Sequence, residues 1–175
     1  MKAYLEEQQP SDADKLRFYE DKLLPLAKLY SLEKHLEDAL SQRVWLKSGG
    51  YLIIQPTEAL TVIDVNTGKY DGKKRQEETF LKINMEAAKE IGRQLRVRNL
   101  SGIIVIDFIS MEDKEKKQEL IEYFKEVIRQ DPVRTTFVDM TGLDLVEITR
   151  KKQHRPLHEQ LGEPCPCCHG NTYLY

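Results

Sequence analysis

Two aspartates in this sequence each follow a short apolar run. Asp64 comes directly after Val62 and Ile63, Asp107 follows residues 103–106, and Asn66 lies two residues beyond Asp64. Carboxylate and amide oxygens are the hard ligands that Mg²⁺ or Mn²⁺ prefers, and such a cation can stabilise charge on a phosphate and activate water. An aspartate at a strand end is also a common turn former or helix cap. The residues alone leave both interpretations open.

The elements around these residues form a strand, a long helix and a second strand. Residues 51–55 and 59–66 are β-branched and predict two strands joined as a hairpin, residues 77–98 predict an amphipathic surface helix, and the apolar run 103–106 predicts another strand. A strand–helix–strand crossover makes its two strands parallel neighbours. Both carboxylates are then expected at the carboxyl edge of one sheet, where open α/β sheets bind ligands.

The remaining pattern completes an α/β fold with a mixed sheet and flanking helices. The unbroken run 103–106 predicts a strand buried on both faces of a parallel sheet. The other expected elements are a helix from Ser11 to Pro25, a short helix over 32–42 before a Gly49–Gly50 turn, a helix from Asp113 to Asp131, strands at 134–140 and 143–149, and a polar tail over 150–175.

The three cysteines lie together near the end of the chain, at Cys165, Cys167 and Cys168. The C-x-x-C spacing of Cys165 and Cys168 provides half of a tetrahedral zinc site. The other half could come from Cys167 or His169 with a further local ligand, or from the same pair in a second copy of the chain, which would make a zinc-bridged dimer. A redox dithiol and an unligated tail are the alternatives.

Two basic patches are candidates for holding a phosphate backbone. The loop 69–75 carries Lys69, Lys73, Lys74 and Arg75 with a single acid, and a second patch contains Arg150, Lys151, Lys152 and Arg155. Runs of charge are usually solvated surface. Beside a metal site, such cations could instead hold a phosphate backbone.

The composition limits the class of protein. The 175 residues are 40% hydrophobic and 32% charged, with 27 Lys and Arg against 29 Asp and Glu, a net charge of −2. This excludes a disordered chain and a protein that holds nucleic acid by bulk charge alone. No apolar run is long enough to cross a bilayer and no targeting segment is visible, so we expect a cytoplasmic protein.

Longer motifs in the sequence resemble the ribonuclease E/G family of bacterial endoribonucleases. The resemblance covers roughly residues 31–170 in one collinear block. Its motifs are Ser48–Gly50, Pro56–Asn66, Asn84 with Glu86–Ala88, Glu90–Ile91 with Arg93–Arg96, Ile104–Ile109 with Met111, and the C-P-x-C-x-G pattern from Cys165 to Gly170.

The residue pattern predicts an N-terminal helical segment over 1–30. The resemblance implies a DNase-I-like catalytic subdomain over 31–150 and an extended zinc-link tail over 151–175. It implies that Asp64 and Asp107 bind Mg²⁺. Asn66 would hold a carboxylate or the scissile phosphate. Cys165 and Cys168 would supply two of the four ligands of a Zn²⁺ shared with a partner protomer. The implied reaction is hydrolysis of single-stranded, often AU-rich RNA to a 5′-phosphate and a 3′-hydroxyl.

Departures from the family pattern also carry expectations. Relatives have an S1-type domain, a 5′-monophosphate sensor and an RNase-H-like subdomain before this segment, and a small oligomerisation domain after the cysteines. Residues 1–30 are too few to encode the first three, so we expect a fragment that is inactive or weakly active alone. Asp144 is acidic where relatives usually have a small residue.

Three hypotheses follow from the sequence. The leading one is the catalytic core of an Mg²⁺-dependent endoribonuclease of RNA processing and decay, with single-stranded RNA and a homodimer partner. The second is a zinc-bridged dimerisation scaffold without catalysis of its own. The third is a metal-dependent phosphoesterase that uses the same aspartates on another substrate.

Overall fold

The structure, a computed structural model, describes residues 2–68 and 76–162. The chain divides into two compact units, Met1–Glu37 and Asp38–Tyr175, which we describe separately. The first unit contains three short helices, α1 (Lys2–Gln8), α2 (Pro10–Ala13) and α3 (Leu26–Leu29), and most of α4 (Leu32–Leu40).

The single helix expected from Ser11 to Pro25 is wrong, because no helix covers residues 14–25. The Asp21 carboxylate accepts hydrogen bonds from the backbone amides of Leu23 and Leu24, at 2.8 and 3.1 Å. Such local side-chain bonds offer the backbone a turn in place of a helix. Leu23 itself is 94% exposed, so the helical spacing of the apolar residues buries little that would stabilise a helix.

The second unit is built on a six-stranded mixed sheet in the order β1-β2-β3-β4-β6-β5. Only β3 and β4 are parallel, and every other neighbouring pair is antiparallel. The predicted α/β class, the hairpin and the parallel crossover are therefore confirmed. The strands are β1 (Arg43–Trp45), β2 (Tyr51–Pro56), β3 (Thr61–Asn66), β4 (Gly102–Asp107), β5 (Thr135–Met140) and β6 (Leu145–Arg150).

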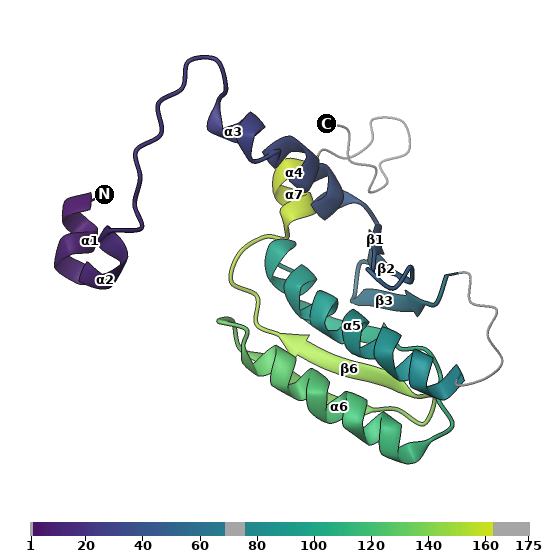
Figure 1. The fold of residues 1–175 in the computed structure, drawn as a ribbon. Coiled ribbons are helices and arrows are strands. Elements are labelled where there is room, and N and C mark those ends of the chain that lie inside the picture. Colours follow the sequence, from purple (N-terminus) through teal and green to yellow (C-terminus); the bar gives the residue numbers. More distant parts are fainter. Residues whose placement is uncertain (1, 69–75, 163–175) are drawn as a thin grey trace. The chain divides into compact units, whose positions relative to one another are not determined.

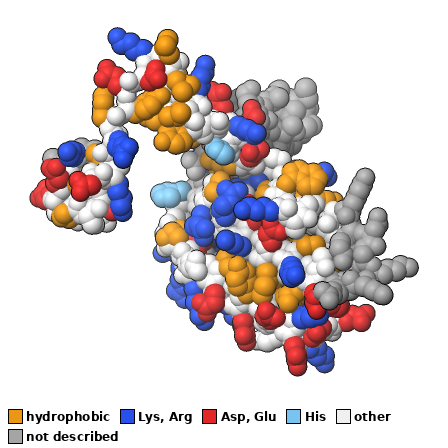
Figure 2. Space-filling view, viewed as in Figure 1, with side chains coloured by type: hydrophobic (Ala, Val, Ile, Leu, Met, Phe, Trp, Pro, Cys, Tyr) orange, Lys and Arg blue, Asp and Glu red, His pale blue; other side chains and the backbone are white. Residues whose placement is uncertain are grey.

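Two long helices, α5 (Gln76–Val97) and α6 (Lys114–Arg129), lie side by side on one face of this sheet (Figure 1). Between them and the strands lies the core, whose fully buried side chains include Ile63, Ile104, Ile106 and Phe124. Figure 2 shows the helix-covered side, where Lys and Arg side chains gather over the C-terminal half of α5. A short helix α7 (Leu157–Leu161) follows the last strand. None of the helices in the described ranges is long and apolar enough to span a bilayer.

Burial on the sheet differs from the prediction for residues 103–106. Ile104 and Ile106 are fully buried, but Ile103 is 51% exposed, so β4 is covered on one face only. The expectation of burial on both faces is wrong because α5 and α6 share one side and neither of them covers the other, which we call the helix-free face with respect to the second unit. The three-residue strand β1, which no sequence pattern predicted, extends the sheet beyond β2.

An ion pair lies in the interior where β6 ends. The Arg150 guanidinium donates two hydrogen bonds to the Asp131 carboxylate, at 2.7 and 3.2 Å, and both side chains are almost completely buried. The same guanidinium donates to the Leu100 carbonyl at 2.9 Å and to the Asn99 side chain at 3.1 Å. Burial raises the pKa of Asp131, but the bonds from Arg150 and from the Val133 amide outweigh it and hold that pKa below its usual range.

We predict that Asp131→Asn lowers the free energy of unfolding by about 3–5 kcal/mol near neutral pH, because it leaves Arg150 buried without its charge partner. A carboxylate whose folded pKa is lowered stabilises the fold above its ordinary pKa, and this contribution is lost as the pH falls through the folded value. The difference between wild type and variant should therefore shrink in strong acid. Urea unfolding across that pH range measures it.

Glu126→Gln is the matched control, since it breaks the solvent-exposed pair between Glu126 and Arg129. It should cost less than about 1 kcal/mol. A cost for Asp131→Asn that equals the control, or that is the same at every pH, would contradict this account of the buried pair.

Candidate active site

Asp64 and Asp107 lie opposite each other in the parallel pair of strands. The register aligns Thr61 with Ile104 and continues to Asp64 beside Asp107. Alternate residues of each strand point to opposite faces. Because Ile63 and Ile106 face the core, both carboxylates lie on the helix-free face of the sheet, near the carboxyl end of β3 and β4.

Asn66 completes this group from the end of β3. Its Nδ2 donates a hydrogen bond of 2.7 Å to Asp64 Oδ2, which fixes the orientation of that carboxylate. Burial raises the pKa of Asp107, and the nearby negative charge of Asp64 raises it further. The two carboxylates therefore repel each other in a partly desolvated place.

The donor set suits a divalent cation. Two carboxylates at neighbouring register positions supply hard oxygens, and a cation between them would offset the repulsion that raises the Asp107 pKa. An amide that orients a ligand carboxylate is typical of the surroundings of a metal. Among the described residues no third His, Cys, Asp or Glu joins them, so water and substrate oxygens would fill the rest of the coordination shell.

A buried asparagine on α5 holds the loop that follows Asp107. The Asn84 side chain is fully buried, donates to the Ile109 carbonyl at 2.8 Å and accepts from the Ile109 amide at 3.0 Å. Both backbone groups of Ile109 are therefore paired with one side chain. This arrangement fixes the chain two residues after Asp107.

The turn between β1 and β2 supports the other side of the group. Glu86 of α5 accepts hydrogen bonds from the backbone amides of Lys47, at 2.6 Å, and Ser48, at 3.2 Å. Gly50 packs so closely on β3 that a Cβ there would lie 2.8 Å from the Asn66 carbonyl oxygen. The Gly49–Gly50 pair therefore allows the turn to contact the backbone of Asn66.

Comparison with known proteins decides the family. A model of the "Ribonuclease E/G family" matches residues 1–153. The chain belongs to the ribonuclease E/G family. It is 46% identical over 146 residues to ribonuclease E of Nostoc sp. (strain PCC 7120 / SAG 25.82 / UTEX 2576), which is 83% of this chain and 21% of that relative.

Two ribonuclease G proteins are also similar. Identity to that of Haemophilus influenzae is 42% over 170 residues, covering 97% of this chain and 34% of the relative. Identity to the ribonuclease G of Escherichia coli (strain K12) is 40% over 161 residues, which covers 92% of this chain and 33% of that relative. The chain thus spans about a fifth to a third of the length of these relatives. The family recognised from sequence motifs is confirmed, and the mixed sheet with flanking helices agrees with a DNase-I-like subdomain.

The structure separates the basic residues of the ribonuclease E/G chain that were grouped in sequence. Lys69, Lys73, Lys74 and Arg75 lie outside the described residues, as do Cys165 and Cys168 with Cys167 and His169. Arg150 is only 4% exposed and its guanidinium is engaged by Asp131. Its assignment to an RNA-binding patch is therefore corrected to an internal structural role.

Lys151 and Lys152 are exposed, but they are distant from the aspartates. Arg150, the residue before them, pairs with Gly102 at the opposite end of β4 from Asp107. Strand geometry places these two ends about 16 Å apart. Lys152 contributes there to an open hollow together with His154 and Arg155.

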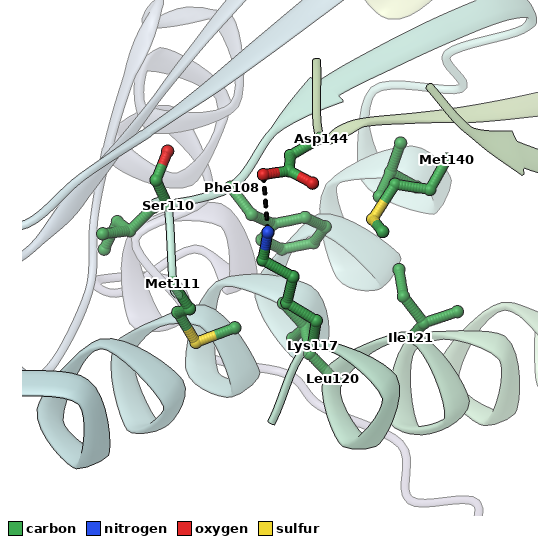
Figure 3. A pocket seen from close by; sticks show the side chains of 10 residues that line it. Phe108, Ser110, Met111, Lys117, Leu120, Ile121, Met140 and Asp144 are labelled. Carbon is green, nitrogen blue, oxygen red and sulfur yellow. Dashed lines mark hydrogen bonds and ion pairs between the residues drawn. The ribbon is translucent and has the colours of Figure 1, made fainter. Parts of the chain in front are cut away.

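Asp144 lines a small pocket together with residues 108–111, which follow Asp107 (Figure 3). Its carboxylate pairs with Lys117 Nζ at 2.7 Å, and Phe108, Met111 and Met140 line the same pocket. The backbone of Asp144 has φ +62°, a region that favours glycine. Aspartate is one of the few other residues that adopt this region readily, and here its side chain takes part in an intramolecular ion pair.

Asn84 lies in one of the family motifs, but the motif alone does not predict its role. Its signal was present in the helical spacing, because Asn84, Ala87, Ala88 and Ile91 form one stripe that is otherwise apolar. A polar residue on a buried helix face must pair its amide. Here the partner is the loop that follows Asp107.

We predict that Asn84→Ala lowers the free energy of unfolding by about 2 kcal/mol, because both backbone groups of Ile109 lose their buried partner. The Ile109 amide should also exchange its hydrogen with solvent much faster than in the wild type. Amide hydrogen exchange followed by NMR measures this. Gln118→Ala, which removes an exposed bond to Glu122, is the control and should change neither quantity. Unchanged protection of Ile109 in Asn84→Ala would refute the role.

Proposed function

We propose that this chain carries the hydrolytic centre of an Mg²⁺-dependent endoribonuclease that cleaves single-stranded RNA in RNA processing and decay. The observation that supports it is the alignment of Asp64 with Asp107 on the helix-free face of a ribonuclease E/G chain. We further propose that it acts in the cytoplasm. Because the chain covers only about a fifth to a third of the length of its relatives, we also propose that it acts as part of a longer protein.

In this proposal Asp64 and Asp107 hold Mg²⁺, or Mn²⁺ in its place. When bound, the cation would stabilise charge on the scissile phosphate and lower the pKa of an attacking water. A water oxygen forms a bond to phosphorus while the bond from phosphorus to the 3′ oxygen breaks, and the 3′ oxygen takes a proton. The products are a 5′-phosphate and a 3′-hydroxyl.

Asn66 acts as a positioning residue. Its amide holds one oxygen of Asp64, so that the carboxylate keeps one orientation toward the cation. Asn84 is also a positioning residue, because its side chain holds the loop after Asp107 through both backbone groups of Ile109.

Six basic side chains are proposed as phosphate contacts rather than as part of the reacting group. Because Lys69, Lys73, Lys74 and Arg75 follow closely after Asn66 in sequence, we propose that they hold phosphates near the cleaved bond. Lys151 and Lys152, at the far end of β4, would contact a different part of the same RNA strand.

A second candidate function is a zinc-bridged dimerisation scaffold. It rests on Cys165 and Cys168, whose spacing supplies half of a zinc site that an identical pair could complete. We propose this bridge as an addition to catalysis, giving a homodimer. Metal analysis beside sedimentation should find one zinc per two chains and a monomer for Cys165→Ser. A metal-free wild-type monomer would exclude the bridge.

We predict that Asp64→Asn and Asp107→Asn each lower cleavage of a 5′-labelled unstructured RNA by at least about 100-fold in the full-length gene product, since each removes a charged ligand that acts in the transition state. Wild-type cleavage by either variant would refute the proposal. The alternative hypothesis is a metal-dependent phosphoesterase that uses the same aspartates on another substrate. It requires that DNA or a small phosphodiester be cleaved faster than RNA.

Loss of fold is separated from loss of chemistry by two controls. Asp139→Asn replaces an exposed aspartate on β5 and should keep full activity. Mn²⁺ should broaden NMR signals around Asp64 and Asp107 in the wild-type chain and not in Asp107→Asn. Broadening that is unchanged by the substitution would place the cation elsewhere.

A further inference from the structure

Beside Asp64 and Asn66 the helix-free face of the sheet carries two aromatic rings and an arginine. Trp45 of β1 pairs with Tyr51 of β2, and Tyr51 pairs with Asn66 of β3. In the next row Arg43 pairs with Ile53, and Ile53 pairs with Asp64. Val44, Leu52 and Val65, which lie between these two rows along the three strands, face the core. The two rows therefore lie on the opposite face, together with the aspartates.

The three side chains contact one another. The Trp45 and Tyr51 rings lie 5.3 Å apart, edge to face. The Arg43 guanidinium carbon lies 4.6 Å from the Tyr51 ring centre and 5.5 Å from that of Trp45. This stacking holds three side chains in one arrangement before any ligand arrives.

Much of this cluster faces solvent. Trp45 is 64% exposed and Arg43 is exposed as well. Within the described ranges Arg43 takes part in no salt bridge, so its charge is not neutralised by a carboxylate of those residues. A large aromatic surface and a positive charge therefore lie together about two strand spacings, roughly 10 Å, from the backbone of Asn66.

We propose that Arg43, Trp45 and Tyr51 form a stacking platform that binds an unpaired base of single-stranded RNA and its phosphate, next to the bond that is cleaved. This deepens the proposed function and rests on it. A base would stack on the exposed indole, and Arg43 would pair with the adjacent phosphate. The row Trp45, Tyr51, Asn66 makes this surface continuous with the candidate active site.

The chemistry of the platform selects the kind of RNA it takes. A base in a duplex is stacked on its neighbours and has no free face to offer an aromatic side chain. The Arg43 charge favours a polyanion over an apolar protein segment. The platform should therefore bind single strands and discriminate weakly among base sequences, since every base has a π-face.

Trp45 is the only tryptophan of the 175 residues, so its fluorescence reports on the platform directly. We expect a short single-stranded oligouridylate, in the absence of added divalent metal, to quench this emission, and a duplex RNA of equal length to quench it far less. By anisotropy of a fluorescein-labelled oligouridylate, Trp45→Leu should weaken binding about 5- to 100-fold. Trp45→Phe should keep most of the affinity.

Matched controls test the two parts of the platform separately. Phe18→Leu removes an aromatic side chain that is 90% exposed elsewhere and should leave binding unchanged. Arg43→Gln should weaken RNA binding. It should also make the plot of the logarithm of the binding constant against the logarithm of salt concentration less steep, by about the amount that one phosphate contact contributes. Arg129→Gln on α6 should change neither the affinity nor this slope.

Three results would overturn the platform. The first is RNA binding that does not quench the Trp45 emission, and the second is equal RNA affinity in Trp45→Leu and Phe18→Leu. The third is Trp45 emission that shifts with protein concentration alone, because this would assign the surface to contact with a second copy of the chain. Each leaves the hydrolytic proposal standing if Asp107→Asn still abolishes cleavage. Quenching by RNA with full cleavage in Asp107→Asn would refute the hydrolytic centre instead.

Discussion

The parallel register between β3 and β4 is the constraint on which the rest of the site depends. It places Asp64 beside Asp107, on strands about 4.8 Å apart. The core fixes it, because Ile63 and Ile106 are fully buried under the helices. A slip of one residue would turn Asp107 toward that core and expose an isoleucine. Packing on one face of the sheet therefore determines the chemistry of the other.

Asp64 and Asp107 repel each other, and the neighbouring residues hold them in place. Burial and the charge of Asp64 raise the pKa of Asp107, so the two carboxylates repel each other and a divalent cation would offset that repulsion. Asn66 orients one carboxylate, Asn84 holds the loop after the other, and Gly50 allows the adjoining turn to reach Asn66. The aromatic surface at β1 and β2 extends the same face toward the RNA that we propose as substrate.

Sequence patterns predicted the elements that have strong periodicity and missed those decided by tertiary contact. The long helix α5, the β2–β3 hairpin and the parallel β3–β4 crossover follow from residue spacing, and with them the meeting of Asp64 and Asp107. Periodicity could not show that Arg150 is buried, because its partner Asp131 lies 19 residues away and their pairing depends on the fold. It also could not show that β4 has an open face, since an unbroken apolar run does not reveal which side the helices cover. Strand β1 is too short to carry a pattern, which left Trp45 unassigned.

The central claim is that Asp64 and Asp107 act as one unit on the RNA phosphate. A double-mutant cycle on RNA cleavage by the full-length gene product tests it most directly, with Asp64→Asn, Asp107→Asn and the two combined. Groups that act as a unit lose nearly all of their effect when either one is removed. The account predicts that the double variant cleaves at about the rate of the slower single variant. Two losses that multiply in the double variant would show independent roles and contradict it.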